Sequence, residues 1–253
     1  MYFTHAACLS TLGRRRVVLV LQRLRHRPSE LAAAIVSNLD DPTHHQRRAI
    51  RKWQDLKSRL EGNLNDANNP RTPTEREMQR LIDVISEIFF LGQLKHIKFV
   101  WKEGLETEDG DLGRISLPTA GLASRHWACI EVDPKDCRNL MLDHFTSLMG
   151  RLLHECIRAF LLVYSCNSAC GNSTCEREIG KTGHGSAWLR IMSYVEAFVD
   201  EHLHRGVYLG IDEAIAVEYS RSGYAPTLQE RALCHPMSHD ALQMFAEDLA
   251  ERN

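Results

Sequence analysis

The chain has 253 residues, of which 43% are hydrophobic and 25% are charged, and its formal net charge is −2. This composition is that of an ordinary globular protein, large enough for one core and an appendage. No run approaches the ~20 apolar residues that a membrane span needs, and we find no internal repeat or low-complexity tract. We therefore expect no membrane partner.

The charge is unevenly distributed along the chain. Residues 1–72 contain 13 Lys and Arg against 6 Asp and Glu, whereas residues 73–253 contain 18 against 27. A basic arm on an acidic body can contact phosphates or the body itself, and the count does not choose between them. Residues 1–29 hold six arginines and no acidic residue. Mitochondrial presequences share this feature, although serine is sparse here.

The first part of the chain is predicted to be helical. Short helical patterns cover 31–39 and 43–60, and the second has apolar residues at helical spacing, including Trp53, Leu56 and Leu60. Residues 61–73 are rich in Asn, Pro and Gly, which is typical of a linker. We expect a basic helical arm and linker over 1–73, followed by a domain boundary.

A capping box opens the next element. Thr74 and Glu77 have the spacing at which each side chain satisfies a backbone N–H of the other, and a helix with a continuous apolar stripe is predicted over 74–92. Glycines then separate three segments with β character, which predict a small antiparallel or mixed sheet. These segments are 97–101, 114–117 and 127–132.

The second half is mainly helical by its apolar periodicity. A long helix is predicted over 136–164, in two pieces near Gly150, followed by a loop over 166–175. Another amphipathic helix follows residues 183–185. The tail is predicted to contain shorter helical elements at 211–219, 227–233 and 240–251.

The long helix carries His154-Glu155-Cys156-Ile157-Arg158, which matches the zinc-protease signature H-E-x-x-H except at its last position. In that signature, residues i and i+4 project from one helical face, so two imidazoles bind one zinc ion while the glutamate faces the bound water. Arg158 stands where the second histidine should be. Its guanidinium stays protonated and offers only donors, so it cannot ligate a metal.

Two separated motifs resemble one family. An apolar helix carrying Leu152-Leu153-His154-Glu155 is followed by a cysteine-rich loop and then by Gly183-His184-Gly185 at the opening of another helix. This combination resembles the SprT-like, or Spartan-type, zinc metalloproteases, in which H-E-x-x-H is completed by a histidine from a downstream G-H-G segment. The resemblance covers residues 74 to about 203.

The resemblance implies an α+β, mainly α fold: a zincin-like SprT domain over 74–205 with a small β-sheet packed on helices, and a helical C-terminal extension over 206–253. Carried over by position, His154 is the first zinc ligand, His184 the final ligand and Glu155 the general base. The implied cofactor is Zn²⁺, weakly held or lost. The implied substrate is a protein or peptide, with DNA association and a nuclear context by analogy alone.

Arg158 leaves three outcomes open. In the first, Arg158 pairs with Glu155 at i, i+3 and the site is inactive. In the second, zinc persists through a substitute ligand such as a loop cysteine or a distant histidine, although Cys156 lies on another helical face. In the third, the arginine is a local variant in an otherwise active protease.

The cysteines also leave alternatives open. Cys166, Cys170 and Cys175 are spaced more loosely than a paired C-x2-C zinc site, and a fourth ligand from His184, Cys156 or Cys137 would be needed. Free thiols and a disulfide within the loop are the other two possibilities. Without a signal peptide pattern, reduced thiols or metal ligands are expected more than a disulfide framework.

The expected function is therefore that of a SprT-like metalloprotease-family protein whose peptidase activity is impaired by Arg158. The alternative is a non-enzymatic peptide-associated or DNA-associated binding module on the same fold. We expect the protein in the nucleus or the cytoplasm rather than in mitochondria.

Overall fold

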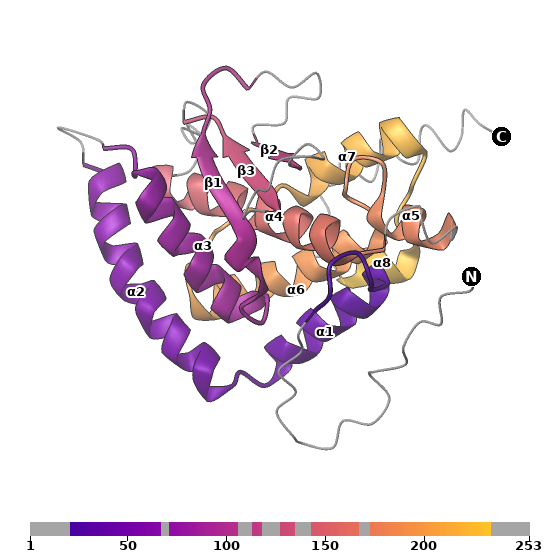
Figure 1. Ribbon diagram of the computed structural model, residues 1–253, viewed down its shortest axis with the longest axis horizontal. Helices are drawn as coiled ribbons and strands as arrows, with labels where there is room; N and C mark the ends of the chain where they lie inside the picture. The colour runs from indigo at the N-terminus through magenta and orange to yellow at the C-terminus, as the bar shows by residue number, and fades with distance from the viewer. Residues whose placement is uncertain are drawn as a thin grey trace.

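The computed structural model describes residues 21–66, 71–105, 113–117, 127–134, 143–166 and 173–233. Its architecture is α+β and mainly helical, with one three-stranded sheet (Figure 1). The expected fold class is confirmed at that level. Among the described residues, no helix combines the length and the apolar character that a membrane crossing requires.

Three helices precede the sheet, and two of them begin with capping boxes. These are α1 (Pro28–Asp40), α2 (His44–Leu64) and α3 (Glu75–Phe89). At the start of α3, Thr74 Oγ1 accepts the Glu77 N–H at 3.3 Å, and Glu77 Oε2 accepts the Thr74 N–H at 2.8 Å. The sequence prediction at this position is confirmed. The bonds satisfy backbone donors that a helix start otherwise leaves to water.

Helices α2 and α3 lie on either side of the predicted linker in the sequence and pack on each other. The side-chain amide of Gln46 on α2 is buried and donates to the Ile88 carbonyl of α3 at 2.9 Å. Trp53 is also fully buried and belongs to the same hydrophobic cluster as the apolar side chains of α3, α4 and α6. The arm and the following helices therefore share one core. Residues 67–70 of the linker lie outside the described part.

The sheet is mixed. A 3-10 turn, η1 (Gln93–His96), leads into β1 (Ile97–Trp101), which pairs in parallel with β3 (Ala128–Val132). Strand β2 (Gly113–Ser116) pairs antiparallel with β3, so the strand order is β1-β3-β2. The three predicted strands are confirmed to within a residue at each end.

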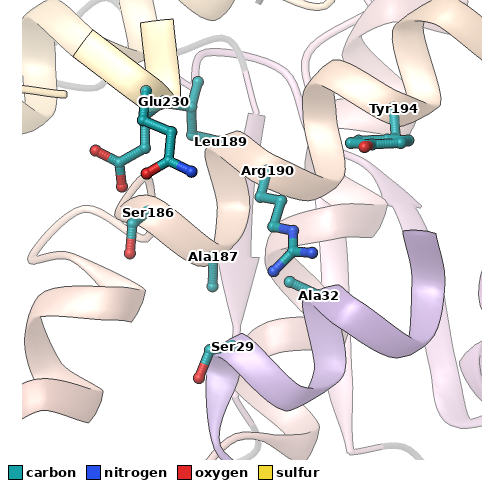
Figure 2. Close-up of a pocket in the computed structure, with 9 residues that line it drawn as sticks. Ser29, Ala32, Ser186, Ala187, Leu189, Arg190, Tyr194 and Glu230 are labelled. Atoms are coloured by element: carbon teal, nitrogen blue, oxygen red, sulfur yellow. The ribbon is translucent and has the colours of Figure 1, made fainter. Parts of the chain in front are cut away.

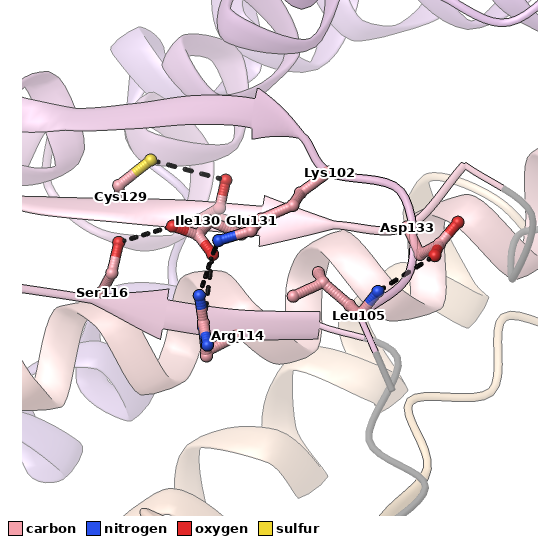
Figure 3. Close-up of polar contacts among 8 residues, drawn as sticks. All are labelled: Lys102, Leu105, Arg114, Ser116, Cys129, Ile130, Glu131 and Asp133. Atoms are coloured by element: carbon pink, nitrogen blue, oxygen red, sulfur yellow. Dashed lines mark hydrogen bonds and ion pairs between the residues drawn. The ribbon is translucent and has the colours of Figure 1, made fainter. Parts of the chain in front are cut away.

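One face of the sheet is covered by helices, and the other is polar. Helix α3 packs against β1, and α4 packs against β2 and β3. On the opposite face, Glu131 accepts from Lys102, Arg114 and Ser116 at 3.1, 2.7 and 2.9 Å (Figure 3). This alternation of apolar and polar residues fixes which face of each strand meets the helices.

In the described part of the chain, five helices follow the sheet: α4 (His144–Tyr164), α5 (Ser173–Ile179), α6 (Ser186–His202), α7 (Ile211–Ser222) and α8 (Leu228–Leu233). Helix α4 runs through Gly150 without a break, so the predicted division into two pieces is wrong. Helix α5 begins inside the predicted loop over 166–175. The predicted helical residues 136–142 and 240–251 lie outside the described part.

Candidate functional site

The two motif histidines meet in the interior of the protein. His154 lies in the middle of α4, and His184 lies two residues before α6. Their Nε2 atoms are 2.9 Å apart, and only 5% of His154 and 1% of His184 is exposed. Two imidazoles separated by 30 residues in the sequence thus converge at one buried point, as the resemblance implied.

The other nitrogen of His154 is anchored to the segment before α7. Its Nδ1 lies 2.9 Å from the carbonyl oxygen of Leu209. A carbonyl can only accept, so Nδ1 carries the proton and Nε2 presents a lone pair when the ring is neutral. The close approach depends on Gly150, one turn earlier, because a Cβ at that position would collide with the backbone of Tyr208.

His184 is anchored in the same sense from the other side. Its Nδ1 lies 2.7 Å from Thr182 Oγ1, and the Thr182 hydroxyl donates to Glu218 Oε2 at 2.6 Å. A hydroxyl has one proton, so its oxygen must accept from His184 Nδ1–H. Burial raises the pKa of Glu218, but hydrogen bonds from Thr182 and Ser222 and from the backbone N–H groups of Thr182 and Lys181 hold it below its usual value overall.

Two neutral rings in these tautomers point their Nε2 lone pairs at each other across the 2.9 Å contact, an arrangement that a cation between them would stabilise. Burial lowers the pKa of His184 strongly, and the positive charges of a protonated His154 and of Arg158 lower it further, so the two rings do not carry a proton on every nitrogen at the same time. These tautomers are also the ones that a metal ion would require, because metal-binding histidines present one nitrogen and donate the other N–H to a second group. Two nitrogens bound to one tetrahedral zinc ion lie about 3.3 Å apart.

Trp188 closes one side of the histidine pair. Its ring centroid lies 5.0 Å from that of His154 and 4.7 Å from that of His184, and the side chain is fully buried. Tight packing of this kind holds both rings in orientation and excludes water from that side.

The glutamate of the motif is held by the arginine that replaces the second histidine. Arg158 Nη1 lies 3.2 and 3.1 Å from the two carboxylate oxygens of Glu155, whose side chain is fully buried. Arg158 Nη2 donates to the Thr182 carbonyl at 2.9 Å. The i, i+3 ion pair expected from the sequence is therefore present. The guanidinium also joins α4 to the loop that carries His184.

Strand β2 lies directly over Glu155. A Cβ atom at Gly113 would stand 2.7 Å from Glu155 Oε1, which is closer than real Cβ contacts. Gly113 begins β2, and β2 is an edge strand of the described sheet. The edge of the sheet therefore borders the motif helix at its carboxylate.

A third metal ligand does not come from the described residues, where no group of three or more His, Cys, Asp and Glu side chains has metal-binding geometry. Cys156 is fully buried, and burial together with the negative charge of Glu155 raises the pKa of its thiol. A thiol that resists ionisation is a poor metal ligand. Within the described residues the two histidines therefore supply two nitrogens, fewer than the three protein ligands of a usual catalytic zinc site.

Two of the loop cysteines lie together away from the histidines. The Sγ atoms of Cys166 and Cys175 are 3.1 Å apart, both residues are buried, and no disulfide joins them. Cys137 and Cys170 lie outside the described residues. The alternatives for this cluster stay open, with two sulfurs brought into contact.

Sequence reasoning missed the groups that anchor the two histidines, namely the Leu209 carbonyl and the Glu218 carboxylate. A backbone carbonyl leaves no mark in a sequence. Glu218 did leave one, because it falls on the apolar face of α7 with Ile211, Ala214 and Ile215 and is itself fully buried. An acidic residue on an apolar stripe indicates a buried carboxylate with dedicated partners.

A separate cavity of about 370 Å³ lies between α1, α6 and α8 (Figure 2). Its walls include Ser29, Ser186, Arg190 and Glu230, and the guanidinium of Arg190 extends into it. None of His154, Glu155 and His184 lines it. The cavity is therefore distinct from the histidine pair.

Comparisons with models of known protein families, with curated proteins and with solved structures find no match to this chain.

Proposed function

We propose that the chain is a SprT-like zincin in which His154 and His184 hold a zinc ion weakly and in which Arg158 impairs the peptidase activity. The observation that carries the proposal is the position of the Arg158 guanidinium. It contacts both oxygens of Glu155 and the carbonyl of Thr182. One side chain thereby removes a metal ligand and occupies the general base.

The ion pair opposes proton transfer by Glu155. A general base must lie within hydrogen-bond reach of the proton that it removes. Here both oxygens of a fully buried carboxylate are directed at a guanidinium whose side chain is 13% exposed, and such a pair loses much of its stabilisation when one partner moves away. Glu155 is therefore held in a structural role.

Arg158 also weakens metal binding. Catalytic zinc sites in proteins have three protein ligands and a water, and this pair supplies two. The fixed positive charge that lowers the pKa of His184 disfavours a divalent cation at the same nitrogen. When bound, zinc would polarise a carbonyl and bring the pKa of its water to about 7.

The substrate class and setting follow from the family resemblance. A protein or peptide would be the ligand, and association with DNA and a nuclear or cytoplasmic location are proposed by analogy. The exposed arginines 47, 48 and 51 on α2 are compatible with a polyanionic partner.

A second candidate function is peptide binding without cleavage. Strand β2 is an edge strand within the described sheet and packs on Glu155 at Gly113. An extended peptide can add to such an edge through main-chain hydrogen bonds. The wild-type protein would then bind an unfolded polypeptide such as denatured casein and leave it intact.

Reversion of the arginine tests the leading proposal. We expect Arg158→His to raise bound zinc, measured by plasma mass spectrometry after dialysis, from well below one ion per chain to about one. We expect the same variant to cleave denatured casein. Adding Glu155→Gln should abolish that cleavage and leave zinc bound.

Arg158→Gln is the matched control, because it removes the positive charge without supplying a ligand. If Arg158→His folds normally, by circular dichroism, and yet binds no more zinc than Arg158→Gln, the assignment of His154 and His184 as a metal pair is wrong. If it binds zinc without any cleavage, the peptide-binding alternative is favoured.

A further inference from the structure

The carboxylate of Glu218 accepts several hydrogen bonds next to the histidine pair, although Glu218 lies beyond the segment that resembles the protease family. It is fully buried on α7. Its oxygens accept the backbone N–H groups of Lys181 and Thr182, each at 2.8 Å, and the Thr182 hydroxyl at 2.6 Å. All of these donors belong to the loop that leads to His184.

Gly180 of this loop lies directly against that carboxylate. A Cβ atom at Gly180 would stand 2.5 Å from Glu218 Oε2, and Gly180 has a φ of +83° that L-residues rarely adopt. Gly180 therefore provides both the space for the carboxylate and the turn that directs two successive N–H groups towards it. The loop and Glu218 form one fitted unit.

The direction of the hydrogen bonds determines which nitrogen of the His184 imidazole carries the proton. The Thr182 hydroxyl donates its single proton to Glu218, so its oxygen can only accept from His184 Nδ1. Nε2 of His184 is then left without a proton and faces Nε2 of His154. A chain of two hydrogen bonds from α7 thus selects the tautomer of a residue 34 positions earlier.

The other ring is governed by the same part of the chain. Leu209, just before α7, accepts from His154 Nδ1. Both histidines therefore take their tautomers from residues between Gly206 and the end of α7, one through a backbone carbonyl and one through a carboxylate.

We infer that Glu218, acting through Thr182, is a positioning residue that holds His184 as the Nδ1–H tautomer with its Nε2 available for a cation shared with His154, and that the segment 207–222 is part of the site. The identification of that cation as a metal ion rests on the proposed function. Glu218 contacts neither the metal nor a substrate in this assignment. It orients a ligand, as outer-shell carboxylates do.

Thr182→Val tests the inference with Thr182→Ser as its matched control. Valine has nearly the shape of threonine but lacks the hydroxyl, and it keeps the two backbone N–H bonds that Glu218 accepts from this loop. Serine keeps the hydroxyl. If Glu218 only holds the loop, the tautomer of His184 should be the same in Thr182→Val as in the wild type. If Glu218 selects the tautomer through Thr182, it should differ.

The first readout needs no metal. In the metal-free full chain labelled with ¹⁵N-histidine, we expect the His184 ring shifts of the wild type and Thr182→Ser to report the Nδ1–H tautomer. In Thr182→Val the same shifts should move towards a mixture of tautomers. Unchanged His184 shifts in Thr182→Val would overturn the inference.

The second readout is zinc affinity, measured by competition with a chelating dye in the Arg158→His background, where the proposed function expects tighter binding. We expect Thr182→Val to weaken zinc binding by about tenfold to a hundredfold, a range typical of lost outer-shell bonds, and Thr182→Ser to preserve it. A tautomer shift in a protein that binds no zinc supports the positioning role of Glu218 and refutes the proposed function alone. If both variants bind zinc, equal affinity would overturn the inference.

Discussion

Gly150 of α4 and Tyr208 of the following segment are in backbone contact, and the Tyr208 carbonyl occupies the space that a side chain at position 150 would need. His154 stands one helical turn beyond Gly150 on the same face. The missing side chain thus allows the chain at 207–209 to reach the helix, and the next carbonyl, that of Leu209, accepts from His154 Nδ1. Gly150 in the middle of the helix therefore serves the imidazole of His154, four residues away, by allowing the Leu209 carbonyl to reach it.

Gly150→Ala should therefore act on stability and on the site together. We expect it to lower the free energy of unfolding by about 1–3 kcal/mol, because a methyl group would force the two backbones apart, and to weaken the bond between His154 and Leu209. Urea denaturation measures the first effect, and the ¹⁵N shift of His154 Nδ1 measures the second.

Gly62→Ala is the control for that substitution, since a Cβ atom at this helical position in α2 meets nothing within 4 Å. We expect it to raise the free energy of unfolding by about 0.5–1 kcal/mol through reduced backbone entropy of the unfolded chain. Equal effects of the two substitutions would contradict the proposed role of Gly150.

The ion pair between Glu155 and Arg158 should show strong coupling in a double-mutant cycle. Arg158→Gln leaves a fully buried carboxylate without the guanidinium, and we expect a loss of about 3–5 kcal/mol in the free energy of unfolding. Glu155→Gln combined with Arg158→Gln removes both charges and should cost much less. Additive single effects in guanidinium denaturation would show that the two side chains do not depend on each other.

The capping box of α3 should make the free energy of unfolding depend on pH in the acidic range. The hydrogen bond from Arg71, together with the bonds from Thr74, lowers the pKa of Glu77 from 4.5 to about 2. The unfolded state therefore takes up the proton first, so the stabilisation is complete above pH 4.5 and is lost as the pH falls towards 2. We expect about 1 kcal/mol, because the Arg71 side chain is 45% exposed and solvent therefore screens the pair. The difference between wild type and Glu77→Gln, measured by urea denaturation from pH 6 to pH 2, should shrink over that range.

Cys166 and Cys175 should form a disulfide on mild oxidation. Their sulfur atoms are 3.1 Å apart, close to the separation that a disulfide needs. With oxidised glutathione, two thiols of the protein are oxidised and the glutathione disulfide is reduced to two thiols. Peptide mapping should find the two cysteines linked, and Cys175→Ser should prevent the link. A product in which Cys166 is joined to another cysteine would contradict the expected pairing.

The local elements were largely predictable from the sequence, and the reasons are local as well. The capping box at Thr74 and Glu77 depends on two residues three positions apart. The strand at 97–101 was predictable from its own residues and those next to it in the sequence. Helix α5 was missed because a short helix within a cysteine-rich segment has no apolar periodicity to mark it. The continuity of α4 through Gly150 was missed because glycine weakens a helix unless something packs against it.

The sequence by itself determined the chemical content of the site: an imidazole, a carboxylate and a guanidinium at fixed spacing on one helix, and a second imidazole in a glycine-rich loop. Tertiary structure alone decided that the two imidazoles meet, that both turn the same nitrogen inward, and that Leu209 and Glu218 hold them so. The physical reason is that a tautomer is set by the hydrogen-bond partner of the opposite nitrogen. The partner of His154 is the Leu209 carbonyl, 55 residues away, and the partner of His184 is Thr182, whose hydroxyl is in turn bound by Glu218, 36 residues further along the chain. Periodicity and motif spacing describe neighbours along the chain, whereas these hydrogen bonds exist only after packing has brought α7 beside the site.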